Sequence, residues 1–263
     1  MAGSPGDGRE TAGTKVVRRA RLISGLIMFS YLVSHFFNHS LGLVSLDAME
    51  EALYWIFRFW TSWPGSIALY GAFLTHFLLA LYGLWTRRTL RLSRTETVQY
   101  ALGFLVPLLL AEHVVGTRVS DAFYKSNFGY YRSLLTVYFH DDPVRGALQA
   151  VVLVVAWVHG CIGLRFWLRL KPWYERAQPF LYAFALLLPV LSLLGYLVAG
   201  WHVAELARDP AWVAETYRLD YRPPLADQEQ LAGIALGLRL FFVASIGGVL
   251  LARLARRQGP RRG

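Results

Sequence analysis

Apolar residues gather in six long stretches, and polar residues occupy the intervals between them. The stretches cover residues 21–45, 65–86, 97–116, 145–169, 177–201 and 230–253. Each has roughly 18 residues or more, which is the length that a helix needs to cross about 30 Å of hydrocarbon. The pattern therefore predicts an all-α fold, a polytopic membrane helix bundle with six transmembrane helices.

The two ends of the chain differ from its middle. Residues 1–17 are rich in Gly and Ser and have no apolar core, so they predict a disordered head. Residues 18–254 form the predicted membrane domain, and residues 255–263 form a basic tail. The first apolar stretch is too long for the core of a signal peptide and lacks a small-residue cleavage site. We therefore expect it to stay in the protein as a membrane anchor.

Composition supports the membrane assignment, and charge predicts an orientation. Hydrophobic residues make up 55% of the chain, charged residues 17%, and the mean hydropathy is +0.37. Most of the 27 Lys and Arg residues lie before the first stretch, after the second, after the fourth or after the sixth. The positive-inside rule then predicts that both termini are cytoplasmic. The net charge of +10 reflects this topology and contact with anionic lipid, and nucleic-acid binding is not expected.

The intervals on the other side are more than short connections. Residues 46–63 and 119–140 mix aromatic with charged side chains, a composition typical of helices that lie along lipid headgroups. Residues 203–228 predict a short helix followed by a Pro-Pro turn. The sequence predicts no separate soluble domain.

Each of the first four apolar stretches contains a histidine well inside the predicted hydrocarbon: His35, His76, His113 and His159. An ionisable side chain at bilayer depth is costly, and it usually faces the interior of the bundle and serves a function. The one cysteine, Cys161, excludes a disulfide within the chain and an iron–sulfur cluster held by four of its own cysteines.

Counting residues from the flanking charges places the four histidines at two depths. At about 1.5 Å per residue, His35 and His113 lie roughly 21 and 25 Å from the cytoplasmic side. By the same count, His76 and His159 lie about 16 and 15 Å from it. We call His35 and His113 the outer pair and His76 and His159 the inner pair. His39 lies one helical turn beyond His35 on the same face, so depth alone leaves the choice between them open.

Two histidines at one depth on different helices suit the axial ligation of haem iron, and a buried histidine prefers the neutral form that ligates. The pattern therefore predicts two b-type haems. The alternative for each histidine is a structural hydrogen bond between helices. Small residues follow or precede the histidines and would let a porphyrin approach the backbone: Ser34, Gly116, Gly160 and Gly163.

Two further charges fall inside predicted helices. Arg239 lies near the middle of the sixth stretch, and Glu112 directly precedes His113. An arginine at this depth needs a partner, and either a haem propionate or Glu112 would serve. Arg118, just outside His113, is a second propionate candidate. Glu112 is also a candidate for proton exchange with a quinone, with an ion pair between helices as the alternative.

Several blocks of the sequence resemble known haem-binding membrane anchors. SHFFNHSLGLVS (34–45) resembles the first-helix ligand motif of succinate dehydrogenase and fumarate reductase cytochrome b anchors, which favours His35 over His39. Three more blocks resemble the six-helix N-terminal membrane anchor of proteobacterial class III adenylate cyclases, and this resemblance extends from about residue 18 to 254. These blocks are LTHFLLALYGLWTRRTLR (74–91), AEHVVGTR (111–118) and WVHGCIGLRFWLRLKPWY (157–174).

The resemblance implies a di-haem b-type protein of the bacterial inner membrane that exchanges electrons with quinone. It implies that His35 and His113 ligate one haem and that His76 and His159 ligate the other. It also implies a cytoplasmic partner, a ferredoxin-like and cyclase domain or subunit. The chain contains no cluster-binding cysteines and no cyclase catalytic region. We therefore expect an electron-transfer or redox-sensing subunit and not an enzyme, either stand-alone or truncated, with its oligomeric state, a homodimer included, left open.

Two other functions compete with this reading. A haem-free anchor or receptor module that senses a lipophilic ligand would use the histidines structurally and would tolerate His76→Ala or His159→Ala. A proton-coupled transporter would use them as a relay. The transporter is disfavoured because the apolar stretches lack paired Gly/Pro breaks at corresponding positions of two halves.

Overall fold

The computed structural model describes residues 12–87, 89, 91–125, 131–219 and 222–258. These residues form helices joined by short connections, without a strand among them. Six helical spans are long and apolar enough to cross a membrane, which confirms the predicted all-α class and the number of spans. The spans are Ala12–Leu43, Trp63–Thr86, Arg94–Tyr124, Pro143–Leu168, Tyr174–Leu206 and Leu225–Arg256.

The described elements follow one another with little intervening chain. They are α1 Ala12–Ser40, η1 Leu41–Leu43, α2 Leu46–Trp60, α3 Trp63–Thr86, α4 Arg94–Val114, η2 Val115–Val119, α5 Ser120–Tyr124, α6 Tyr131–Thr136, η3 Val137–Asp141, α7 Pro143–Leu168, α8 Tyr174–Leu206, α9 Pro210–Leu219 and α10 Leu225–Gln258. The elements η2 and η3 are π-helical turns, and η2 begins two residues after His113.

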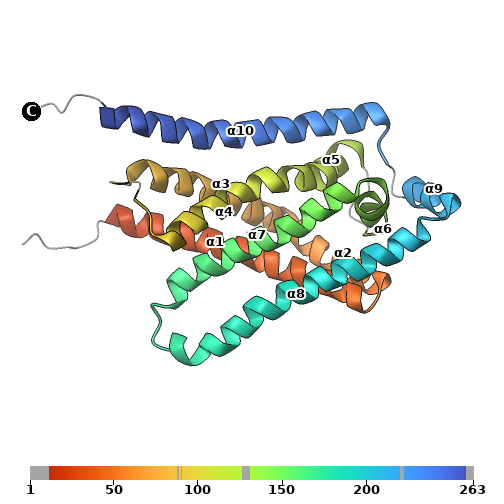
Figure 1. Ribbon diagram of the computed structural model, residues 1–263, viewed down its shortest axis with the longest axis horizontal. Coiled ribbons are helices and arrows are strands. Elements are labelled where there is room, and N and C mark those ends of the chain that lie inside the picture. The colour runs from red at the N-terminus through yellow and green to blue at the C-terminus, as the bar shows by residue number, and fades with distance from the viewer. Residues whose placement is uncertain (1–11, 88, 90, 126–130, 220–221, 259–263) are drawn as a thin grey trace, which may run out of the picture.

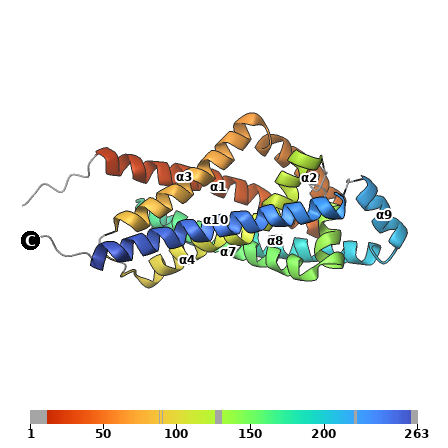
Figure 2. The ribbon, with the colours of Figure 1, turned by 90° about the horizontal axis from the view of Figure 1, so that it is seen from above.

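The long helices run roughly side by side along the longest axis of the molecule (Figure 1). The start of α1 and the end of α10 lie at the same end of the bundle, which we call the terminal end. The short helices α2, α5, α6 and α9 gather at the opposite end, which we call the loop end, in both views (Figures 1 and 2). Helix α1 packs mainly on α3 and α8, whereas α4 packs on α7 and α10.

The helices extend beyond the predicted spans at both ends of the chain. Residues 12–17, predicted as part of a disordered head, are instead the first turns of α1, and residues 1–11 lie outside the described part. Helix α10 likewise continues to Gln258, into the predicted tail, and residues 259–263 are outside the description. A helix has no reason to end at the hydrocarbon boundary, because its backbone hydrogen bonds are internal and Lys and Arg are good helix formers.

The intervals at the loop end are helical, as the sequence predicts. Residues 46–60 form α2, which buries Leu46 and Met49 and leaves Trp55 and Phe59 each 62% exposed. Residues 210–219 form α9, and Pro223 and Pro224 lie in the irregular connection before α10, so that the predicted Pro-Pro turn stays a prediction. That these helices lie along lipid headgroups stays a prediction.

Side chains from neighbouring helices satisfy backbone groups that the helices leave free. Pro189 inside α8 has no N–H to give to the carbonyl four residues earlier, that of Ala185. The indole Nε1 of Trp157 on α7 donates to this carbonyl at 2.7 Å. At the terminal end, buried Arg253 of α10 donates to two carbonyls at the end of α3, those of Leu84 and Arg87. These bonds fix α7 on α8 and α10 on α3.

Candidate functional site

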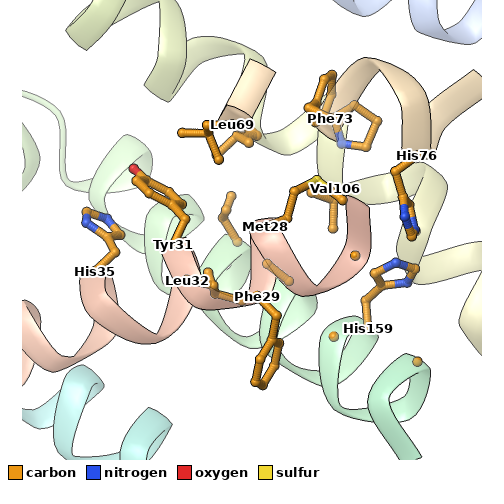
Figure 3. A pocket seen from close by; sticks show the side chains of 18 of the residues that line it. Met28, Phe29, Tyr31, Leu32, His35, Leu69, Phe73, His76, Val106 and His159 are labelled. Carbon is orange, nitrogen blue, oxygen red and sulfur yellow. The ribbon is translucent and has the colours of Figure 1, made fainter. Parts of the chain in front are cut away.

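A cavity of 1220 Å³ lies between α1, α3, α4 and α7. All four predicted histidines line it, and His39 does too. Most other lining side chains are apolar or aromatic. Figure 3 shows His35 at one end of the view, His76 and His159 facing each other at the other end, and Met28, Leu32, Leu69, Phe73 and Val106 between them. The volume exceeds the about 300–1,000 Å³ of an ordinary small-molecule site, so the cavity has room for more than one ligand.

The histidines paired by depth are the ones whose rings approach each other. The ring centroids of His35 and His113 are 6.2 Å apart, and those of His76 and His159 are 6.3 Å apart. A metal–imidazole nitrogen bond is about 2 Å long and each ring adds roughly 1.2 Å, so two imidazoles on opposite sides of one metal have centroids roughly 6.4 Å apart. Both pairs therefore have the separation that one shared metal ion requires.

Each pair connects helices that make few direct contacts. The outer pair joins α1 to α4, and the inner pair joins α3 to α7, whereas the main packing partners in the described residues are α1 with α3 and α4 with α7. The histidines thus reach across the cavity diagonally instead of filling a packed interface.

Hydrogen bonds fix the tautomers of the inner pair. The Nδ1 of His159 lies 3.1 Å from the backbone oxygen of Gln99, which can only accept, so His159 donates its Nδ1–H. The Nδ1 of His76 lies 3.2 Å from the Oγ of Ser24. Because the Ser24 hydroxyl gives its own hydrogen to the Arg21 carbonyl, Oγ accepts from His76. Both rings therefore keep an unprotonated Nε2, the nitrogen that binds a metal.

Each inner histidine ring packs closely against a glycine on a neighbouring helix. A Cβ at Gly103 of α4 would lie 2.5 Å from Cε1 and 3.0 Å from Nδ1 of His159. A Cβ at Gly25 of α1 would lie 3.3 Å from Cε1 of His76. The sequence analysis missed both, because each lies on a different helix from the ring it supports. The signal in the sequence was a glycine within an apolar stretch.

The outer pair is held differently. His113 Nδ1 lies 3.3 Å from the Tyr138 hydroxyl, which can either donate or accept. Burial raises the pKa of the Tyr138 phenol, so it remains protonated. The Nε2 of His35 lies 3.2 Å from the Nε2 of His39, and the buried Nδ1 of His39 has no hydrogen-bond partner among the residues that the structure describes. His39 therefore competes for the nitrogen through which His35 would ligate a metal.

The two arginines predicted at the site have different surroundings. Arg118 lines the cavity; its Nε donates to the Tyr70 hydroxyl at 3.3 Å, and its guanidinium lies 4.9 Å above the Phe57 ring. Asp121 lies 3.8 Å from the Nη1 of Arg118. The position of Arg118 beside the outer end of the cavity suits a contact with a haem propionate, and that role of Arg118 stays a prediction.

Arg239 instead joins an ion-pair group beside the cavity. Its Nη2 contacts Glu112 at 2.7 Å and its Nε donates to the Leu108 carbonyl at 3.1 Å. Glu112 also pairs with Arg145 of α7 at 3.0 Å, a partner that the sequence analysis did not name. Among the described residues the lining of the cavity does not include Arg239. Its predicted contact with a propionate is untested.

The small residues that adjoin the histidines in sequence serve ordinary packing. Gly160 faces Phe29, Gly163 faces the amide of Gln99, and nothing lies near Gly116. Ser34 accepts a hydrogen bond from Trp60 at 3.1 Å. Within the described chain no three His, Cys, Asp or Glu side chains converge as a metal site, so each histidine pair offers two protein ligands.

Comparisons with known proteins give no relative: no protein-family model, curated protein or solved structure matches this chain.

Proposed function

We propose that the chain is a di-haem b-type membrane protein for electron transfer or redox sensing. The observation that carries the proposal is the cavity itself, which two histidine pairs cross at 6.2 and 6.3 Å between ring centroids. Each pair of imidazoles would hold one haem, and the apolar side chains of the cavity would enclose it. The inner pair adds two rings whose hydrogen bonds leave Nε2 unprotonated.

The residues of the chain have separate tasks in this proposal. His76 and His159 would hold one haem, and His113 with His35 would hold the other. The bound iron supplies one-electron redox chemistry. Ser24 and Gln99 keep the inner imidazoles in the ligating tautomer and, by accepting from Nδ1–H, raise their basicity. The apolar side chains between the pairs exclude water, so burial and ligand basicity set the potential.

The direction of electron flow is part of the same proposal. Arginines such as Arg87, Arg169 and Arg256 lie at helix ends of the terminal end, which supports a cytoplasmic location for it in a bacterial inner membrane. The outer pair would then exchange electrons with a quinone and the inner pair would pass them towards a cytoplasmic partner. The resemblance to the class III adenylate cyclase anchors supports a ferredoxin-like or cyclase partner.

The test is a dithionite-reduced minus oxidised absorbance spectrum of the purified protein, with haem measured per chain. We expect a b-type spectrum and two haems per chain. Protein that folds and binds no haem, from cells supplied with iron, would reject the proposal. That result would favour the haem-free alternative, in which the apolar cavity takes up a lipophilic ligand.

A further inference from the structure

The cavity is strongly asymmetric in charge at its terminal end. Cationic residues that line this end are Arg18, Arg19, Arg21, Arg87 and Lys171, and the acidic residue among them is Glu96. The Glu96 carboxylate already has two partners. It forms an ion pair with Arg87 at 2.7 Å and completes the capping box of α4 with Ser93. The charged side chains that line this end are therefore mostly positive.

Arg21 is the cation nearest to the inner pair. Its Nη2 donates to the Leu79 carbonyl on α3 at 2.7 Å, and its buried Nε has no hydrogen-bond partner in the described part of the chain. No carboxylate of the described residues forms an ion pair with it. A partly buried guanidinium that faces an apolar cavity is costly unless an anion accompanies it.

The position of Arg21 is set by the same contacts that set the inner pair. Arg21 Nη2 lies between Leu79 and Gly83, which follow His76 by three and seven residues. The guanidinium therefore lies roughly 5–10 Å along α3 from that histidine, on its terminal side. The carbonyl of Arg21 accepts from Ser24, whose Oγ holds His76. Gly83 makes room for the guanidinium, since a Cβ there would lie 2.8 Å from Nη2.

We propose that Arg21 binds an ionised propionate of the inner haem. The inference rests on the proposed function and adds a ligand-binding residue and an orientation to it. A guanidinium with free N–H groups is a strong partner for a carboxylate. The contact fixes the polar edge of the inner haem towards the terminal end, where the other cations lie. It also neutralises negative charge near the iron and so raises its midpoint potential.

The first experiment compares two forms of the cofactor. Haem-free protein is reconstituted with iron protoporphyrin IX or with its dimethyl ester, in a His113→Ala background that leaves the inner pair alone. We expect Arg21-containing protein to bind the free acid about 10- to 100-fold more tightly than the ester, as a charge-assisted hydrogen bond predicts. Arg21→Gln should reduce this ratio to about 2-fold or less, and Arg21→Lys should restore part of it.

The second experiment needs no reconstitution. A potentiometric titration of protein assembled in cells should show a lower midpoint potential for the inner haem in Arg21→Gln and an unchanged outer haem. Arg176→Gln is the matched control, because Arg176 is exposed at the same end of the bundle. Arg21→Gln that matches Arg176→Gln in potential and in ester discrimination overturns the inference.

An anionic lipid headgroup is the competing occupant. If Arg21→Gln alters only the dependence on phosphatidylglycerol in nanodiscs, and leaves the preference for the free acid intact, the propionate assignment is wrong. Failure of the whole proposed function gives a different result, since the unaltered chain would then carry no haem.

Discussion

The inner and outer histidine pairs line one cavity at nearly the same ring separation, but their surroundings differ. Each inner ring has a hydrogen-bond acceptor at Nδ1, and that contact leaves only one tautomer. The outer level contains three histidines, and the Nε2 atoms of His35 and His39 bond each other. The Tyr138 hydroxyl beside His113 is compatible with either tautomer.

The difference shows that two properties of a histidine pair are independent: the distance between the rings, and the availability of an unprotonated nitrogen on each ring to bind a metal. A histidine binds metal through an unprotonated nitrogen, and the group at the other nitrogen decides which one that is. By this criterion the inner pair is preorganised for a metal. The outer pair must first release the contact between His35 and His39.

The largest predicted effect is the removal of an inner ligand. His159→Ala should leave one haem per chain and remove the inner component from the redox titration, because no other described histidine crosses the cavity at that level. A pyridine haemochrome assay measures the count. His202→Ala is the control, since His202 is exposed near the end of α8, and it should keep both haems. Loss of both haems from folded His159→Ala would show that the two levels are not independent.

The next prediction separates the two candidates at the outer level. His35→Ala should lose the outer haem, because the His35 ring lies 6.2 Å from that of His113. His39→Ala should keep two haems, since it removes only the competitor for His35 Nε2. Haem counts of the two variants, purified in parallel, are the measurement. The reverse result would assign the outer ligand to His39.

A smaller effect is expected from adding a side chain at Gly103, the glycine against which the His159 ring packs. Gly103→Ala should weaken inner haem binding by about 10- to 100-fold, the usual cost of disturbing a group that orients a metal ligand. The new methyl would press on Cε1 and Nδ1 of His159 and displace it from Gln99. Gly233→Ala, where nothing lies near the new Cβ, is the matched control. Equal haem retention in both variants would contradict the conclusion that close packing on Gly103 positions the His159 ring.

The smallest effects should come from the partners at Nδ1. Ser24→Ala removes the acceptor for His76 Nδ1–H and should lower inner haem affinity about 10-fold. Tyr138→Phe should change outer haem affinity only about 2- to 3-fold, because the 3.3 Å contact is long. Competition with an apo-haem acceptor protein measures both. A larger loss in Tyr138→Phe would reverse the ranking of the two levels.

Much of the fold follows from the sequence, because bilayer thickness imposes a length on every span. The match between His76 and His159 also follows, since residue counts along each span give the depth of each histidine. At the outer level the same counts leave His35 and His39 open. Depth, however, says nothing about rotation around each helix axis. That rotation decides which glycine each inner ring packs against, Gly25 or Gly103, and where Arg21 lies. These contacts could not be predicted from neighbours in sequence such as Gly160.

The choice between His35 and His39 shows the same limit. Both lie on one face of α1, and only the three-dimensional structure shows that their Nε2 atoms bond each other. The sequence predicts either a haem propionate or Glu112 as the partner of Arg239, and the structure shows an ion pair between Arg239 and Glu112. Arg145 could not be foreseen, because it belongs to a helix start far away in sequence.

The most direct test of the account is an experimental density map of the purified protein in a lipid nanodisc. We expect two porphyrins in the cavity, one between His76 and His159 and one between His35 and His113. We also expect the polar edge of the inner porphyrin beside Arg21. Lipid or detergent density in the cavity, with the histidine rings bonded only to protein groups, would contradict the account.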